Sequence, residues 1–226
     1  MTPLQYPNES VDYRATRNRL LREELALREQ IERVARQRRA LPPGGLLKED
    51  YVFAERIDGE DRDTRFSELF ASGKDTLFLY NFMYAPDMPE ACPMCTAFLD
   101  GLHGQVEHLE QRINLAIVAK HSLDKVHQHA ASRSWSRFRL LSSAGNSYNA
   151  DYFGETPEGQ TTMANVFVKQ TGEIRHFWGT EMSFADPIEG GNMRHLDLVW
   201  PMWNILDMTP DGRGEHFYPA LSYRQG

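Results

Sequence analysis

Two continuous apolar runs, separated by one helical segment, constrain the fold of this chain more than any other feature. Residues 76–83 read Thr-Leu-Phe-Leu-Tyr-Asn-Phe-Met, and residues 113–119 read Ile-Asn-Leu-Ala-Ile-Val-Ala. Runs of this kind are typical of strands that are covered on both faces of a sheet. Between them, apolar residues recur at helical spacing, at Phe98, Leu99, Leu102, Val106 and Leu109. We therefore predict a strand–helix–strand unit with parallel strands and a right-handed crossover.

The remaining segments predict further elements of an α/β domain. Apolar spacing predicts helices at 12–40, 122–132 and 194–206, the last interrupted by Pro201, and a helical turn at 66–71. Short strands are expected at 51–55 and 138–142, and a hairpin at 165–169 and 174–178. The polar stretch 58–65 reads as a loop or a hairpin tip, the stretch 144–160 as a loop, and residues 207–226 as a tail.

The chain contains two cysteines, in the sequence Cys92-Pro93-Met94-Cys95 at the start of the predicted central helix. Free N–H groups and a partial positive charge at a helix N-terminus stabilise a thiolate, so we expect Cys92 to have a lowered pKa. Pro93 fits the first helical position, and the spacing returns Cys95 to the same helix face. The predicted catalytic pair is therefore Cys92 as nucleophile and Cys95 as the thiol that resolves the mixed disulfide.

Two other interpretations of this cysteine pair stay open: half of a metal site, and inert buried cysteines. The metal interpretation lacks a second Cys-x-x-Cys or a close Cys/His pair, because His103 and His108 lie several turns away on the predicted helix. His127 and His129 alternate and would point apart on a helix. The cysteine pair lies between two predicted buried strands, and this position favours the redox interpretation, with no metal and no organic cofactor.

Charge is distributed unevenly along the 226 residues. The segment from Arg14 to Arg39 holds nine arginines and four glutamates, a net charge of +5, which leaves −12 for the rest of a chain whose total is −7. This balance does not favour nucleic acid as a partner. No apolar run is long enough to span a bilayer, and the N-terminus does not read as a signal peptide, so we expect a cytoplasmic protein with no membrane partner.

The predicted N-terminal helix carries an apolar stripe that has to be buried somewhere. Tyr13, Leu20, Leu27, Ile31 and Val34 recur at helical spacing. Two interpretations remain open: packing on the helix's own domain, or a homodimer contact through the N-terminal helix.

Several motifs along the chain resemble a known bacterial family. They are Arg38-Arg39-Ala40-Leu41-Pro42, Tyr80-Asn81-Phe82-Met83-Tyr84, Cys92-Pro93-Met94-Cys95, Ser142-Ser143-Ala144-Gly145-Asn146 and Asn149-Ala150-Asp151. Together they resemble a thioredoxin-like family labelled as a domain of unknown function, whose members are described as predicted dithiol-disulfide oxidoreductases or isomerases. The resemblance covers nearly the whole chain and implies a thioredoxin-like α/β fold. We expect a central mixed sheet flanked by helices, with a helical arm at 1–45 and a thioredoxin-like domain at 46–226.

One position departs from the thioredoxin pattern. Thioredoxins place a cis-proline just before the strand that faces the dithiol, where this chain has Thr161-Thr162-Met163-Ala164. That proline shapes the substrate groove and keeps metals away from the thiols. Its absence counts against general thioredoxin activity and slightly favours the metal interpretation.

The predicted function is that of a thiol-disulfide oxidoreductase acting on a protein or small-molecule disulfide or thiol. One alternative is a peroxiredoxin-like peroxide reductase, which lacks support from a Thr or Arg at the usual spacing before Cys92. The other is a non-enzymatic thioredoxin-fold module for binding or dimerisation.

Four further residues were candidates for a place near the dithiol. Glu90 is expected to point away from Cys92, since a facing carboxylate would raise the thiol pKa. Asn149 and Asp151 either make turn contacts or border the dithiol. Trp178 is expected in the core or at its rim, with a place in the substrate groove as the alternative.

Overall fold

The computed structural model describes residues 4–186, 199–212 and 217–223. The chain divides into two compact units, Met1–Pro42 and Pro43–Gly226, which are described separately. Within the described residues, no helix has the length and hydropathy needed to cross a membrane.

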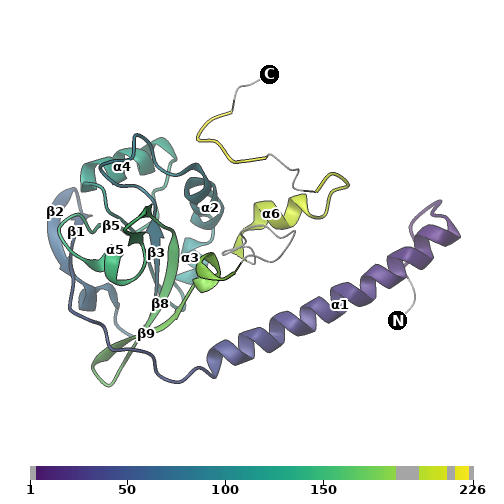
Figure 1. Cartoon of the computed structure of the whole chain (residues 1–226), viewed down its shortest axis with the longest axis horizontal. Coiled ribbons are helices and arrows are strands. Elements are labelled where there is room, and N and C mark those ends of the chain that lie inside the picture. Colours follow the sequence, from purple (N-terminus) through teal and green to yellow (C-terminus); the bar gives the residue numbers. More distant parts are fainter. Residues whose placement is uncertain (1–3, 187–198, 213–216, 224–226) are drawn as a thin grey trace. The chain divides into compact units, whose positions relative to one another are not determined.

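The first unit consists mainly of helix α1 (Val11–Arg39), drawn in purple in Figure 1. Its N-terminus is capped by Ser10, whose hydroxyl accepts a hydrogen bond of 3.0 Å from the Tyr13 N–H. Arg36, Arg38 and Arg39 lie in the last turn, where cations interact favourably with the helix dipole. The predicted helix at 12–40 is confirmed, and none of its residues is buried.

The second unit is built on a seven-stranded mixed sheet in the order β2-β1-β5-β4-β3-β8-β9. The strands are β1 (Val52–Ile57), β2 (Glu60–Arg65), β3 (Thr76–Phe82), β4 (Asn114–Ala119), β5 (Leu140–Ser142), β8 (Met163–Gln170) and β9 (Glu173–Gly179). The helical elements are η1 (Phe66–Leu69), α2 (Pro93–His103), α3 (Val106–Leu109), α4 (Leu123–Ser132), α5 (Tyr148–Asp151), η2 (Glu181–Phe184) and α6 (Pro201–Leu206).

The centre of this sheet is the predicted strand–helix–strand unit. Strands β3 and β4 are parallel, with α2 and α3 between them in the chain, and β5 adds in parallel to β4. On the other side, β8 pairs antiparallel with β3, and β9 with β8. This is the thioredoxin-like arrangement that the family resemblance implies.

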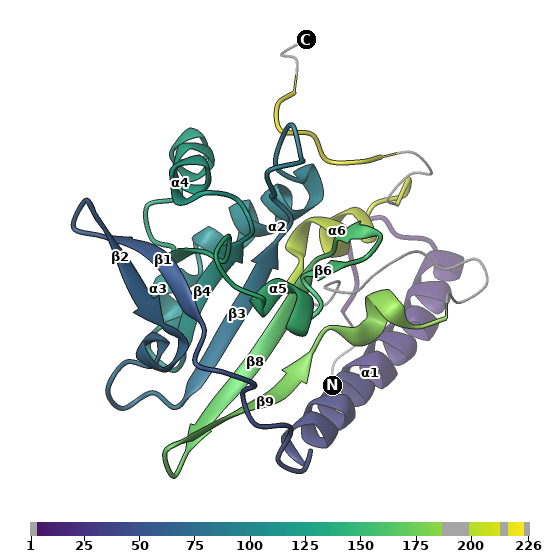
Figure 2. The ribbon, with the colours of Figure 1, turned by 60° about the vertical axis from the view of Figure 1, so that its left-hand side comes forward.

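The sheet is covered on both faces, as the continuous apolar runs require. Tyr80 and Phe82 of β3 pack on one face against α2 and α4, with Trp200 and Trp203 joining from the C-terminal segment. The alternate residues of β3, Leu77 and Leu79, pack on the other face against η1 and α5. Figure 2 shows α5 on the face of the sheet away from α2.

Two tight hairpins bound the sheet. Asp58 and Gly59 join β1 to β2, and Thr171 and Gly172 join β8 to β9; all four have positive φ. Two-residue turns with this geometry match the twist of the strands they connect, and glycine adopts it without strain. Of the two predictions for 58–65, the hairpin tip is confirmed at Asp58 and Gly59, and the loop is wrong because residues 60–65 form strand β2 at the edge of the sheet.

Three other segments differ from the sequence prediction. The predicted helix after the cysteines breaks at Gly104 into α2 and α3. The predicted loop 144–160 contains α5 and a small hairpin of β6 (Glu155–Thr156) and β7 (Gly159–Gln160). Pro201 opens helix α6 at its first turn, where a missing N–H costs nothing, and residues 194–198 of the predicted last helix lie outside the described residues.

Candidate functional site

The N-terminus of α2 positions both cysteines. Cys92 is the N-cap residue, and its sulfur accepts a hydrogen bond of 3.5 Å from the Cys95 N–H. Pro93 occupies the first turn, as predicted. The Cys92 N–H donates to the Met83 carbonyl at 3.1 Å, which fastens the start of the helix to the end of strand β3. Cys92 is half-buried, Cys95 is fully buried, and both are free thiols.

The two thiols have opposite environments. Hydrogen bonding from Cys95, together with the backbone N–H groups of Cys95 and Met94, lowers the pKa of Cys92 to about 6, although burial opposes this. Burial raises the pKa of Cys95, and the neighbouring Cys92 sulfur raises it further. At neutral pH the arrangement therefore holds a thiolate at Cys92 and a protonated thiol at Cys95.

Buried hydroxyl groups extend this network behind Cys95. The phenol of Tyr80, on strand β3, hydrogen-bonds to the Cys95 sulfur. The Tyr80 oxygen in turn accepts a hydrogen bond of 2.8 Å from the Thr162 hydroxyl. Thr162 stands directly before strand β8, in the segment where thioredoxins carry their cis-proline. This segment contains no proline and instead contributes a hydroxyl to the dithiol network.

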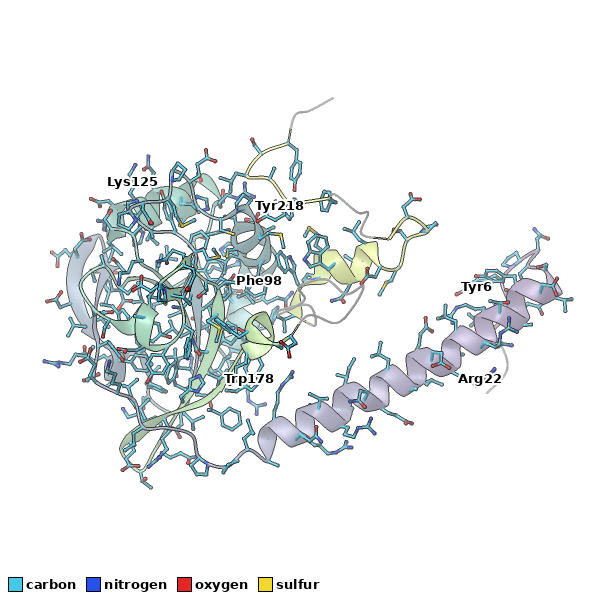
Figure 3. The ribbon with its side chains drawn as sticks, in the orientation of Figure 1. Tyr6, Arg22, Phe98, Lys125, Trp178 and Tyr218 are labelled. Atoms are coloured by element: carbon cyan, nitrogen blue, oxygen red, sulfur yellow. The ribbon has the colours of Figure 1, made fainter. Side chains whose placement is uncertain are left out.

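The C-terminal tail supplies a further hydroxyl. The Tyr218 phenol hydrogen-bonds to the Cys92 sulfur, and it helps to lower the pKa of that thiol. Figure 3 shows Tyr218 in the tail, above Phe98 of α2. The tail is fastened to the helical face, since Arg133 Nη1 donates to the Leu221 carbonyl at 2.8 Å and the same guanidinium pairs with Asp100.

Hydrogen bonds that involve Thr96 of α2 and His129 of α4 also hold the first turn of α2 in place. The Thr96 hydroxyl lies 3.0 Å from the Cys92 carbonyl oxygen and 3.1 Å from His129 Nε2. Burial lowers the pKa of His129, which favours a neutral ring that donates to Thr96. This histidine therefore has a structural role. Glu90 is exposed.

The cysteines line a cavity of about 370 Å³. Its walls combine the dithiol with thioether, aromatic and uncharged polar side chains, namely Tyr80, Met83, Met94, Gln160, Thr161, Thr162, Phe184, Trp200 and Tyr218. Among the described residues that line it, none carries a formal charge apart from the Cys92 thiolate. Trp200, and not Trp178, is the tryptophan of this cavity.

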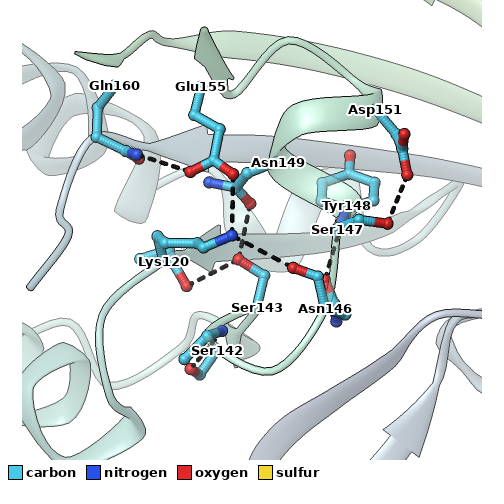
Figure 4. Close-up of polar contacts among 12 residues, drawn as sticks. Lys120, Ser142, Ser143, Asn146, Ser147, Tyr148, Asn149, Asp151, Glu155 and Gln160 are labelled. Atoms are coloured by element: carbon cyan, nitrogen blue, oxygen red, sulfur yellow. Dashed lines mark hydrogen bonds and ion pairs between the residues drawn. The ribbon is translucent and has the colours of Figure 1, made fainter. Parts of the chain in front are cut away.

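Figure 4 shows polar contacts of the segment 142–160. Only its last residue, Gln160, lines the dithiol cavity. Asn149 accepts a hydrogen bond of 2.7 Å from the Ser143 hydroxyl, and Asp151 accepts from Ser147 and Tyr51. Both residues thus stabilise the segment and do not line the cavity. Gln160 does line it, and its amide donates to Glu155 at 3.1 Å.

A larger cavity of about 880 Å³ lies beside strands β8 and β9. Tyr152, Met163, Asn165 and His176 are among its lining residues, and Phe184 lines both cavities. It contains no cysteine. Within the described ranges, no three His, Cys, Asp or Glu side chains are grouped closely enough to hold a metal ion.

Sequence reasoning placed the two cysteines but missed their hydroxyl partners. Tyr80 lies within an apolar run and therefore reads as a core residue. Tyr218 lies in a Pro/Gly-containing tail far from the cysteines in sequence. For Thr162, the one signal in the sequence is the missing proline, which shows that this segment differs from thioredoxins.

Comparison with solved structures finds weak similarities. AhpC from Enterococcus faecalis is 12% identical, with a TM-score of 0.46 over 78% of this chain and 98% of that chain. Peroxidoxin BcpB from Mycobacterium tuberculosis is 17% identical, with a TM-score of 0.42 over 74% and 98%. Oxidized Prx3 from Vibrio vulnificus is 14% identical, with a TM-score of 0.42 over 60% and 88%. None of these similarities bears on the chemistry of Cys92 and Cys95.

Among curated proteins, no relative matches the sequence. One family model does match, over residues 4–225, and its description is a bacterial protein of unknown function (DUF899). Because the match extends over almost the entire chain, the protein belongs to this bacterial family.

Proposed function

We propose that this protein is a thiol-disulfide oxidoreductase in which Cys92 attacks and Cys95 resolves. One observation carries the proposal. The Cys92 sulfur lies at a helix N-terminus and has a pKa lowered to about 6, and the buried Cys95 thiol is hydrogen-bonded to it. An inert structural cysteine pair would not need a stabilised thiolate at a cavity wall. The partner is a disulfide or thiol of a protein or a small molecule.

The chemistry follows from the protonation states. The Cys92 thiolate attacks one sulfur of a substrate disulfide, and the departing thiolate takes a proton from solvent. Cys95 then loses its proton and attacks the Cys92 sulfur of the mixed disulfide, and the second substrate sulfur leaves as a thiolate that takes up this proton and becomes a thiol. The protein dithiol is oxidised to the Cys92–Cys95 disulfide, and the substrate disulfide is reduced to two thiols.

Tyr80 is the residue best placed to assist the second step. Cys95 is protonated and buried, so its attack requires stabilisation of a thiolate away from water. The Tyr80 phenol and the Met83 N–H both hydrogen-bond to the Cys95 sulfur and favour its ionised form. The Thr162 hydroxyl, which donates to Tyr80 at 2.8 Å, keeps the phenol oriented toward this task.

The test compares two single serine variants of the full chain. Cys92→Ser should lower disulfide exchange to the rate seen without protein. Cys95→Ser should still react once and then accumulate the mixed disulfide, which mass spectrometry detects as an adduct on Cys92. If Cys92→Ser exchanges disulfides as fast as the wild type, the proposal is wrong.

Peroxide reduction is the second candidate, and the Tyr218 hydroxyl at the Cys92 sulfur is the observation that favours it. A hydroxyl at this place could hydrogen-bond to a peroxide oxygen during attack by the thiolate. No cation lines the described walls of the cavity, so this candidate ranks second. Trapping of sulfenic acid at Cys92 in the Cys95→Ser variant, at a rate above that of a free thiol, would favour peroxide reduction.

A further inference from the structure

The walls of the dithiol cavity specify what kind of disulfide can reach Cys92. Its volume of about 370 Å³ lies in the range of small-molecule sites. We propose that the substrate is an uncharged, low-molecular-weight disulfide with apolar substituents. This inference rests on the proposed oxidoreductase function and narrows it to one substrate class.

The uncharged character of the described lining side chains is the first argument. None of the described lining side chains is charged, apart from the Cys92 thiolate itself. A carboxylate that enters such a site loses its hydration without gaining a charged partner, and an ammonium group finds only the Cys92 thiolate, whose charge is lost when it attacks the disulfide. Glutathione disulfide, which carries several groups of both kinds, fits these walls poorly.

The character of the walls is the second argument. Met83 and Met94 stand beside the dithiol, and Trp200 and Tyr218 face it from the C-terminal part of the chain. Thioether side chains are flexible and polarisable, so they adapt to apolar groups of varied shape. Aromatic rings add large apolar contact areas. An apolar substituent on sulfur therefore gains contacts here that a hydrated group does not.

The cover over Cys92 is the third argument. Trp200 is only 4% exposed, and Pro219, next to Tyr218, is buried. Arg133 fastens the tail at the Leu221 carbonyl, at 2.8 Å, while its pairing with Asp100 ties it to α2. These segments narrow the approach to the Cys92 sulfur for a folded protein, although Tyr218 is 59% exposed. A small disulfide needs only the cavity.

The reaction balances with a second dithiol as the reductant. The substrate disulfide and the protein dithiol give two substrate thiols and the Cys92–Cys95 disulfide. A small dithiol, dithiothreitol in the assay, then reduces this disulfide and is itself oxidised.

The test uses three disulfides of similar size: hydroxyethyl disulfide, which is uncharged, dithiodipropionate, which is anionic, and cystamine, which is cationic. The rate of exchange with the full-length reduced protein is divided by the rate with free mercaptoethanol, which corrects for intrinsic reactivity. We expect the uncharged disulfide to exceed both charged ones by at least about tenfold, because each unpaired charge is penalised in the cavity.

Two matched variants distinguish the effect of a charge in the cavity wall from the effect of the protein's overall electrostatic field. Gln160→Lys places a cation in the wall, and Gln170→Lys adds the same charge at an exposed position of the β8–β9 turn. Relative to hydroxyethyl disulfide, the rate with dithiodipropionate should rise in Gln160→Lys and stay at the wild-type value in Gln170→Lys. An equal rise in both variants would contradict a cavity effect.

The other outcomes are also decisive. Equal corrected rates for all three disulfides would overturn the inference but leave the oxidoreductase function intact. A preference for cystamine over hydroxyethyl disulfide would show selection by the acidic field of the protein and not by apolar walls. Absence of exchange with every disulfide, while iodoacetamide still alkylates Cys92, would instead contradict the proposed function itself.

Discussion

The reactivity of Cys92 depends on a small number of atoms around its sulfur. A thiol at a helix N-terminus that accepts hydrogen bonds ionises more easily than a free thiol. Here the donors are the Cys95 side chain, two backbone N–H groups and the Tyr218 phenol. The two side-chain donors can each be removed by substitution, so the contribution of each to the pKa of Cys92 can be measured.

The pH dependence of alkylation tests the thiolate directly. With a pKa of about 6, Cys92 is mostly ionised at pH 7. The rate of its reaction with iodoacetamide should be nearly constant above neutral pH and fall about tenfold per unit well below pH 6, because only the thiolate reacts. Mass spectrometry of the modified peptide gives the rate for Cys92 alone. A midpoint near that of free cysteine would contradict the lowered pKa.

Replacement of Cys95 should separate hydrogen bonding from the other effects. Cys95→Ala removes the side-chain donor that contributes most to the lowered pKa of Cys92, so the pKa should rise. Cys95→Ser keeps a donor at the same place and should show the smaller change. The same alkylation assay measures both. Identical profiles for the alanine and serine variants would show that the Cys95 side chain does not stabilise the thiolate.

The tail tyrosine can be tested with a matched control in the same segment. Tyr218→Phe removes the phenol that hydrogen-bonds to Cys92, so the pKa of Cys92 should rise and its alkylation at pH 6 should slow. Tyr223→Phe removes a phenol that contacts the Ala220 N–H, at 3.2 Å, and should leave the alkylation profile unchanged. Equal behaviour of the two variants would contradict a contact between Tyr218 and the thiolate.

Single residues differ in how far the sequence reveals their roles. Cys92 and Cys95 are recognisable because their spacing and position before a helix carry a chemical meaning. Tyr80 is not recognisable, since an aromatic residue in a buried strand usually serves packing alone. Its hydroxyl gains a role only through Cys95 and Thr162, which the fold brings beside it from different segments.

Among the elements, those with a strong hydrophobic period were predictable. The apolar runs that form β3 and β4 and the stripe of α1 are examples. Strand β2 was missed because five of its six residues are charged, and its place at a sheet edge leaves most of them exposed. Only the Asp-Gly turn before it signalled a hairpin. The Gly104 break was missed because the apolar period continues into α3.

The segment 142–160 offers a test of the packing around its short helix. A Cβ at Gly154 would lie 2.0 Å from the buried Asn81 Nδ2, whereas a Cβ at Gly145 would meet nothing within 4 Å. Gly154→Ala should therefore lower the free energy of unfolding by about 1–3 kcal/mol, the usual cost of overpacking. Gly145→Ala serves as the control with a much smaller change. Urea denaturation measures both, and equal stabilities would contradict the described packing.

The apolar face of α1 leaves the predicted homodimer as a proposal. Leu20, Leu27 and Ile31 are exposed, although they lie on the predicted stripe. If this stripe joins two copies, Leu27→Glu should shift the full-length protein from dimer to monomer, since a carboxylate cannot be buried there without a partner. Light scattering measures the mass, with Arg28→Glu as a control for charge. A wild-type monomer would contradict the proposal.

At the scale of the whole molecule, local sequence patterns do not specify which distant segments of the chain come together. The sequence indicated parallel neighbours for β3 and β4, but it did not indicate that β1 and β2 extend the sheet beyond β5. It also did not indicate that Trp200 and Tyr218 line the dithiol cavity. Both features depend on contacts between segments far apart in the chain, whose energies are not visible in any local period.

Charge at this scale agrees with the substrate class inferred from the cavity. Outside the arginine-rich segment the chain carries −12, which disfavours the approach of anionic disulfides at low ionic strength. Added salt should therefore raise the rate with dithiodipropionate only in part. The difference in rate from hydroxyethyl disulfide that remains at high salt is caused by the uncharged cavity walls, where salt screens charges only weakly.

The most direct test of the central claim is the reduction potential of the Cys92–Cys95 pair. The full-length protein is equilibrated in mercaptoethanol or dithiothreitol redox buffers, and free thiols are counted by alkylation and mass. We predict one two-electron transition between roughly −120 and −270 mV, the range of catalytic dithiols, because the stabilised thiolate favours the reduced form. If no disulfide forms between Cys92 and Cys95 across the accessible range, the pair is not a redox centre and the account is wrong.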